Sequence, residues 1–103
     1  MRVAFKMRLK KGCAAEYKRR HNSIWPELKA LLKENGVSNY TIFLDEETQV
    51  LFAVQDVDGE GDSQTLGSHP IMQRWWDYMA DLMEVNADNS PVSVPLQPMF
   101  FMK

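Results

Sequence analysis

The spacing of apolar residues changes once near the start of this chain, and this change constrains the fold more than any other feature. From Val3 to Leu9 every second residue is apolar, and most residues between them are lysine or arginine. A period of two predicts a β-strand with one buried face. From Cys13 onward the apolar residues recur at intervals of three and four, which predicts one long amphipathic helix that ends at Asn35 and Gly36.

Pro26 falls inside this helical pattern. Its ring removes one backbone hydrogen bond and crowds the preceding turn, so we expect a kink near His21 and Asn22. Irregular backbone of this kind often lies beside a functional site. Alternatively, the kink only lets the helix curve around the core. The helical pattern does not choose between these two interpretations.

Two segments rich in aromatic and β-branched residues follow the helix, at 39–44 and 49–57. The polar residues 45–48 between them mark a turn, so the two segments predict an antiparallel hairpin. Residues 56–67 contain three glycines and four acids with few apolar residues, and here we expect an exposed connection with little regular structure.

A second main helix is predicted after Ser68, because a capping residue followed by His69 and Pro70 is typical of a helix start. Its wide apolar stripe runs from Ile71 to Met83 at helical spacing. We interpret His69 as an exposed residue of the helix cap rather than as a catalytic one.

Residues 96–102 predict a last strand, which the prolines at 95 and 98 confine to the edge of a sheet. The order of elements is then β-α-β-β-α-β, that of a ferredoxin-like α+β domain with an antiparallel sheet and both helices on one face. The chain has 103 residues, so we expect a single domain over 1–103. The other sheet face is left uncovered, and a second copy packed against it would give a homodimer, a dimeric α/β barrel.

The two parts of the chain carry opposite charge, although the net charge is only −2. Residues 1–33 contain ten lysines and arginines against two acids, and residues 34–103 contain twelve acids against two bases. The basic residues alternate with apolar residues at regular spacing, which does not fit a nucleic-acid-binding arm. We expect oppositely charged elements to lie side by side, either within the fold or across a dimer contact.

Several classes of protein are disfavoured by what the sequence lacks. Cys13 is the single cysteine, so no disulfide within the chain and no cysteine-rich metal site is expected, and the cytoplasm fits best. Charges interrupt the N-terminal residues too often for a signal peptide, and no apolar run approaches a membrane span. No HExxH, CxxC, P-loop or GxGxxG motif is present, so we expect no metal and no cofactor. We interpret Cys13 as a residue of the helix start rather than as a nucleophile.

Three polar rings are predicted to point into the core. Tyr17 and His21 are four residues apart on the inward face of the first helix. Tyr40 begins the hairpin and shares a strand face with Ile42 and Leu44, which should look at the helices. His21 is either a satisfied core histidine or a group that transfers protons.

Trp75 and Trp76 are adjacent on the second helix, so their side chains diverge by about 100°. They therefore cannot both enter the same packed layer, and one of them would line a cavity. A flat aromatic ring beside hydrogen-bonding groups suits a sugar, whose C–H patches stack on rings. The alternative is that both indoles only fill the core.

Four sets of segments are long and rich in uncommon residues: Tyr17 to Leu28, Asn39-Tyr40 with Leu44-Asp45, Gln73 to Trp76 with Tyr78-Met79, and Asp88 to Ser93. In order and spacing these segments resemble the L-rhamnose mutarotase family. The resemblance covers nearly the whole chain and departs chiefly at residues 58–68, where glycines replace a segment expected to be more helical.

This resemblance implies an isomerase without a cofactor that interconverts the α and β anomers of L-rhamnose, built as a dimeric ferredoxin-like barrel. It implies that His21 is the proton donor. It also implies that the sugar is contacted by four aromatic residues: Tyr17, Tyr40, Trp75 and Trp76.

Mutarotation needs a proton removed from the anomeric hydroxyl and another given to the ring oxygen, which suits an imidazole at neutral pH. The complementary base stays open among Tyr17, Tyr40, Asp45 and a bound water. Two other functions are considered: a ferredoxin-like module that binds a small sugar without converting it, and a small dimeric-barrel oxygenase.

Overall fold

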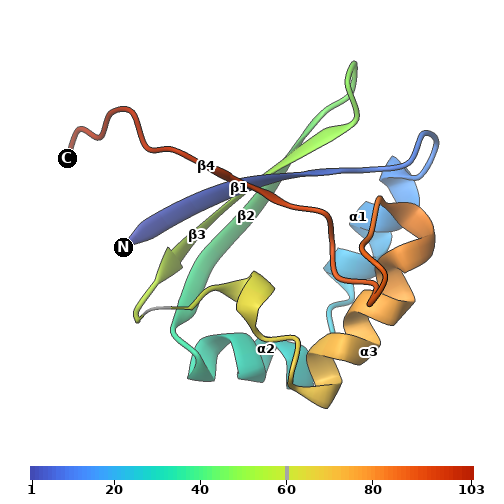
Figure 1. The fold of residues 1–103 in the computed structure, drawn as a ribbon, viewed down its shortest axis with the longest axis horizontal. Coiled ribbons are helices and arrows are strands. Elements are labelled where there is room, and N and C mark those ends of the chain that lie inside the picture. Colours follow the sequence, from blue (N-terminus) through green and yellow to red (C-terminus); the bar gives the residue numbers. More distant parts are fainter. Residues whose placement is uncertain (60) are drawn as a thin grey trace.

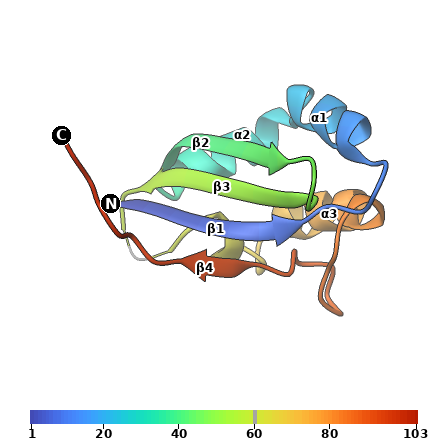
Figure 2. The ribbon, with the colours of Figure 1, turned by 90° about the horizontal axis from the view of Figure 1, so that it is seen from above.

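The computed structural model describes residues 1–59 and 61–103. Its elements are β1 (Arg2–Arg8), α1 (Ala14–Asn22), α2 (Pro26–Glu34), β2 (Val37–Asp45), β3 (Val50–Val57), α3 (Pro70–Met79) and β4 (Val94–Leu96), with short 3-10 helices η1 (Ser63–Thr65) and η2 (Ala80–Leu82). The strands form one sheet in the order β2-β3-β1-β4, and each neighbouring pair is antiparallel (Figure 2).

The helices cover one face of this sheet, and the core lies between the two layers (Figures 1 and 2). The alternating residues predicted for β1 are buried on this face, with Phe5 4% and Met7 5% exposed. On the opposite face Phe43 and Phe52 pair across β2 and β3, and their exposed fractions are 60% and 37%. These observations confirm the ferredoxin-like α+β fold and the uncovered sheet face.

Pro26 ends the predicted long helix instead of kinking it. The chain forms α1 and α2, joined by an extended Trp25 with φ −64° and ψ 132°. A residue before proline is pushed out of the helical region, and proline fits well at the first position of a new helix. The prediction of one continuous helix was therefore wrong, and the break follows directly after the turn that carries His21.

A β-bulge in β2 determines which residues of that strand face the helices. The register with β3 shifts between Ser38 and Thr41, and Asn39 takes the left-handed conformation at φ 49°. The Asn39 side chain donates a hydrogen bond to Asp56 Oδ2 at 2.8 Å, which holds the bulge. One extra residue reverses the alternation, so that both Val37 and Tyr40 point toward the helices.

The segment predicted to be an exposed connection, residues 56–67, is partly ordered and partly buried. Val57 belongs to β3, η1 follows, and the exposed fractions of Ser63 and Leu66 are 2% and 7%. The expectation of an exposed, irregular connection was wrong for these residues, because η1 packs back onto the core. The part of that prediction concerning residue 60 lies outside the described residues.

The last strand is shorter and earlier than predicted. Residues 94–96 of β4 pair with β1 at the sheet edge, with Pro95 opposite Phe5. Residues 97–103 take no regular structure and project from the sheet (Figure 1). Pro98 lacks a backbone donor and does not continue the ladder. The edge position is confirmed, whereas the predicted span of 96–102 was wrong.

Helix α3 begins one residue later than the sequence suggested. His69, not Ser68, occupies the capping position, and its side chain makes no capping hydrogen bond. Pro70 is the first helical residue, so the expectation of a proline in the first turn is confirmed. Cys13 stands at the start of α1, also as expected.

The opposite charges of the two parts of the chain meet within the fold. Among the described residues, three ion pairs join the basic N-terminal third to the acidic remainder: Arg2–Asp56 at 3.0 Å, Arg8–Glu84 at 3.6 Å and Arg20–Asp81 at 2.8 Å. This confirms that oppositely charged elements lie side by side in one protomer.

Candidate active site

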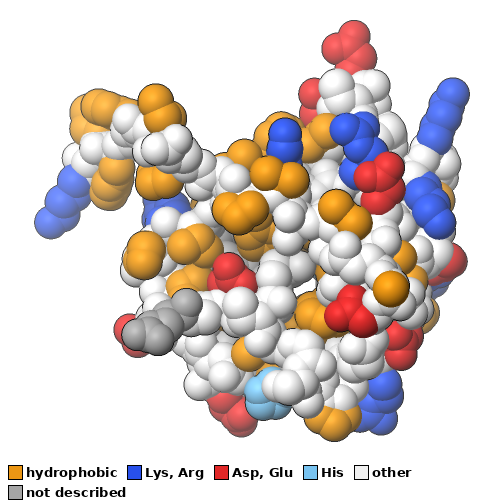
Figure 3. All heavy atoms as spheres, in the orientation of Figure 1, with side chains coloured by type: hydrophobic (Ala, Val, Ile, Leu, Met, Phe, Trp, Pro, Cys, Tyr) orange, Lys and Arg blue, Asp and Glu red, His pale blue; other side chains and the backbone are white. Residues whose placement is uncertain are grey.

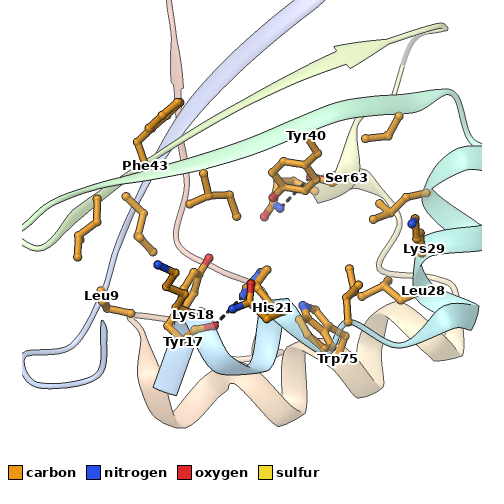
Figure 4. A pocket seen from close by; sticks show the side chains of 18 of the residues that line it. Leu9, Tyr17, Lys18, His21, Leu28, Lys29, Tyr40, Phe43, Ser63 and Trp75 are labelled. Carbon is orange, nitrogen blue, oxygen red and sulfur yellow. Dashed lines mark hydrogen bonds between the residues drawn. The ribbon is translucent and has the colours of Figure 1, made fainter. Parts of the chain in front are cut away.

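A cavity of about 910 Å³ lies between the sheet and the helices. Tyr40 and Ser63 enter it from the sheet side, and Tyr17, His21 and Trp75 enter it from the helix side (Figure 4). A smaller cavity of about 40 Å³ adjoins the large one. Five residues line both cavities: Tyr17, His21, Tyr40, Gln64 and Trp75. Four of the five site residues predicted from the sequence thus line the large cavity, and all five line the small one.

His21 is fixed by the helix that carries it. Its Nδ1 lies 3.1 Å from the backbone oxygen of Tyr17. A carbonyl oxygen only accepts, so Nδ1 carries the proton and Nε2 keeps its lone pair. The imidazole also stacks on the Tyr17 ring at 4.4 Å and meets the Trp75 ring edge to face at 5.3 Å. Within residues 1–59 and 61–103 no group hydrogen-bonds to Nε2, which leaves this atom to a ligand.

The surroundings of His21 decide its charge. Burial lowers the pKa of His21 below its ordinary value of 6.5, while the hydrogen bond to the Tyr17 carbonyl opposes this shift. The imidazole is therefore neutral near pH 7. A neutral ring with a free Nε2 can take a proton from a hydroxyl and then give it away.

Both tyrosines of the cavity stay protonated at neutral pH. Burial raises the pKa of the Tyr40 hydroxyl to about 12 and that of Tyr17 further still above its ordinary value. Each hydroxyl can donate a hydrogen bond to a ligand but is a poor base. Asp45, another candidate base, is exposed at the end of β2 and accepts from the backbone nitrogen of Glu47 at 3.1 Å. It does not line the cavity.

Arg20 links α1, the helix that carries His21, to the segment that follows α3. Its side chain is 11% exposed and bonds Glu16 at 2.7 Å within α1 and Asp81 at 2.8 Å after α3. The guanidinium also lies 4.4 Å from the centroid of the Tyr78 ring. A largely covered arginine with two carboxylate partners fixes α1 against α3, and thereby fixes the position of His21.

The two adjacent tryptophans have different surroundings, although both are buried. Trp75 lines the large cavity and packs edge to face on Trp25 at 5.1 Å. Trp76 lines only the small cavity and packs on Gly67, where a Cβ would lie 2.7 Å from the indole. As expected, one of the two indoles, that of Trp75, lines the large cavity. The expectation that they cannot share a packed layer was wrong, because both are buried in the same core and both line the small cavity.

Sequence reasoning missed Ser63 and Gln64, which lie in the segment it took for an exposed connection. Both line the large cavity. The signal that would have found them is the pair Asp62 and Thr65, three residues apart, which form a reciprocal capping box around η1.

Among the described residues no group of three or more histidine, cysteine or acidic side chains is arranged to hold a metal ion. The described helices are all too short or too polar to cross a lipid bilayer.

The fold and the site together define a class: a ferredoxin-like α+β protein whose cavity is partly lined by aromatic rings and presents one neutral imidazole, with Nε2 unbonded among the described residues, to a small polar ligand. The sequence model of the L-rhamnose mutarotase family matches residues 2–102. The chain belongs to this family, a family of isomerases that interconvert sugar anomers. The resemblance drawn from the sequence motifs, and the enzyme class it implied, are confirmed.

Relatives cover almost the whole chain. An L-rhamnose mutarotase of Bacteroides thetaiotaomicron is 64% identical over 98% of this chain and 97% of its own length. One of Formosa agariphila is 60% identical over 99% of this chain and 98% of its own length.

Solved structures agree with the fold. The crystal structure of an L-rhamnose mutarotase of Formosa agariphila superposes with a TM-score of 0.93 at 56% identity, covering 100% of this chain and 99% of that one. A Methanosarcina mazei protein superposes with a TM-score of 0.60 at 15% identity, covering 95% of this chain and 91% of that one. At that identity the second likeness concerns the fold alone.

Proposed function

We propose that this chain, as a single domain over 1–103, interconverts the α and β anomers of L-rhamnose, with His21 as the proton donor. The observation that carries this proposal is the free Nε2 of His21 in a cavity that is lined by aromatic rings and is large enough for a monosaccharide. The names of the relatives support L-rhamnose as the sugar.

The reaction requires only proton transfer and rotation. The anomeric hydroxyl loses its proton, the bond between C1 and the ring oxygen breaks, and the ring oxygen takes up a proton. The product is an open-chain aldehyde. Rotation about the C1–C2 bond presents the other face of the aldehyde, and the reverse transfers close the ring as the other anomer. No atom is gained or lost, and no electron leaves the sugar.

His21 serves as the donor by passing on a proton that it has first accepted. Because the neutral ring presents the Nε2 lone pair, Nε2 takes the anomeric proton, directly or through a bound water, and gives it to the ring oxygen. Both oxygens are bonded to C1, so a small movement of the sugar brings each in turn to Nε2.

The aromatic residues hold the sugar in this mechanism. The Trp75 ring offers a flat apolar face, while the protonated hydroxyls of Tyr17 and Tyr40 donate to sugar oxygens. Trp76 contacts the sugar from the small cavity, which Trp75 also lines.

Nuclear magnetic resonance tests the activity directly. Saturation of one anomeric proton of L-rhamnose reports the rate at which the other anomer forms, and the protein is expected to raise that rate well above the rate in buffer. A panel of 6-deoxy and ordinary aldoses then gives the specificity. A module that only binds sugar would shift resonances without faster exchange, and an oxygenase would consume oxygen. Either result would contradict the proposal.

We also propose that two copies pack sheet against sheet as a homodimer in the cytoplasm. The uncovered face carries the Phe43–Phe52 pair, and Val94 on β4 is 47% exposed. Hydrophobic atoms cover much of the projecting C-terminal segment (Figure 3), where Phe100 and Phe101 are 84% and 71% exposed. Burying this surface against a second copy removes an apolar patch from water. The free Cys13 fits a reducing compartment.

A further inference from the structure

Gln64 stands where the two cavities meet. It lines both cavities together with His21, Tyr17, Tyr40 and Trp75. Four of these five side chains are rings, and Gln64 is the one that ends in an amide. A sugar ring offers C–H patches to aromatic faces, but its hydroxyls need groups that donate and accept hydrogen bonds.

The backbone beneath Gln64 is held rigidly to the sheet. Ser63 donates its backbone N–H to Gln55 Oε1 at 2.9 Å, and Gln55 Nε2 donates to Ser63 Oγ at 2.8 Å. Both residues are buried, with exposed fractions of 0% for Gln55 and 2% for Ser63. Buried polar groups are tolerated when they satisfy each other, so this reciprocal pair anchors η1 to β3.

The start of η1 is fixed independently of the Gln64 side chain. The carboxylate of Asp62 accepts from the backbone nitrogen of Gln64 at 2.8 Å, and Thr65 Oγ1 accepts from the backbone nitrogen of Asp62 at 3.1 Å. These bonds use main-chain groups and neighbouring residues, so they survive a change of side chain at position 64. The Gln64 side chain is therefore carried by a rigid element, η1, whose structure does not depend on that side chain.

The amide of Gln64 is almost uncommitted. Its Nε2 donates to Ser63 Oγ at 3.3 Å, a long bond to an oxygen that already accepts from Gln55. In the part of the chain that the structure describes, no group donates to Gln64 Oε1. One acceptor and one further N–H are therefore free beside the reacting imidazole.

We propose that Gln64 is a specificity-determining residue that hydrogen-bonds one ring hydroxyl of the bound sugar, donating through Nε2 or accepting through Oε1. This inference rests on the proposed function, because it assigns a further contact to the same substrate. A site that hydrogen-bonds a hydroxyl rejects an analogue without that hydroxyl much more strongly than an apolar site does. Gln64 thus adds discrimination among hydroxyl patterns, which the aromatic rings do not provide.

The test is a double-mutant cycle in which one change is a substitution of Gln64 and the other is the removal of one hydroxyl from the sugar. Exchange rates are measured as a function of concentration for L-rhamnose and for its 2-deoxy, 3-deoxy and 4-deoxy analogues, with the unmodified protein and with Gln64→Met. Methionine keeps the length of the side chain and removes the amide. For L-rhamnose, KM is expected to rise about fivefold to thirtyfold, which equals about 1 to 2 kcal/mol, with kcat changed by about twofold or less. For one analogue the two proteins should share the same KM, because the hydroxyl that Gln64 binds is already absent.

The other outcomes separate this inference from the proposed function. If the unmodified protein does not accelerate L-rhamnose exchange, the proposed function is wrong. If that protein is active and Gln64→Met changes KM for none of the sugars, or by the same factor for all four, then Gln64 does not bind a hydroxyl. Gln97→Met is the matched control, since it removes an exposed amide outside the cavity and should change no KM. Should Gln64→Met fail to fold, as judged by its thermal unfolding, Gln64→Leu, which also removes both amide atoms, is taken through the same cycle with the same expected outcomes.

Discussion

The imidazole of His21 donates its Nδ1 proton to the backbone carbonyl of Tyr17, one helical turn earlier, at 3.1 Å. The tautomer of His21 is thus set by the main chain of α1 and not by a second side chain. Histidines that transfer protons are commonly oriented by a hydrogen bond of this kind. The consequence is a fixed division of roles, in which Nδ1 orients the ring and Nε2 is available for chemistry.

Replacing His21 removes the only imidazole of the cavity. We expect His21→Ala to slow anomer exchange by about 10² to 10⁴-fold, the usual contribution of a placed general acid or base. The side chain is only half-buried, so the protein should stay folded. Saturation exchange and circular dichroism measure the two effects. His69→Ala, at the start of α3, is the matched control and should keep the full rate. Equal rates in the two variants would refute the assignment of His21.

The pH dependence follows from the lowered pKa of His21. A lowered pKa means that the ring loses its proton at a lower pH than a free histidine, so it is neutral at pH 7. As the pH falls through this pKa, below 6.5, Nε2 becomes protonated and can no longer accept the anomeric proton. After subtraction of the exchange in buffer, kcat/KM should be flat above the midpoint and fall about tenfold per pH unit below it. A midpoint above 6.5, or activity that rises toward acid, would contradict this mechanism.

Substitutions of Trp75 and Trp76 should affect sugar binding and protein stability to different extents. Trp75→Phe removes part of the face that the cavity offers, so we expect KM to rise about twofold to tenfold. Because Trp75 is 7% exposed and packs on Trp25, a loss of stability should accompany this rise in KM. Trp76→Phe leaves a gap against Gly67 in the core, so we expect a loss of about 1 to 3 kcal/mol in the free energy of unfolding and a smaller change in KM. Denaturant unfolding and concentration-dependent exchange measure both quantities. The opposite assignment of effects would show that Trp76 is the main sugar-binding indole.

A negative charge introduced on the uncovered sheet face should dissociate the proposed dimer into monomers. Sedimentation equilibrium is expected to give twice the 11.9 kDa chain mass for the unmodified protein and the single mass for Phe43→Glu. A carboxylate buried in a sheet-to-sheet contact would lose its hydration without gaining a partner. Lys11→Glu, in the exposed turn before α1, should remain dimeric. An unmodified protein that stays monomeric at all concentrations would disprove the dimer.

Much of the architecture and most of the site were predictable from local pattern. The change of period from two to three and four separates β1 from the helices, because strands and helices expose side chains at these two spacings. The separation of four residues between Tyr17 and His21 places both rings on one helix face whatever the rest of the chain does. The motifs around His21 and Trp75 also point to the family, since long runs of rare residues do not recur by chance.

Only the tertiary structure decided how the remaining groups join this site. Val37 lines the large cavity on the same side as Tyr40 because a bulge at Asn39, held by Asp56 on the neighbouring strand, shifts the alternation of β2 by one residue. Gln64 reaches the cavity because Ser63 is bonded to Gln55, eight residues away, in the interior. A sequence determines spacing along one element, whereas these positions depend on partners in other elements, whose pairing emerges only when the chain has packed.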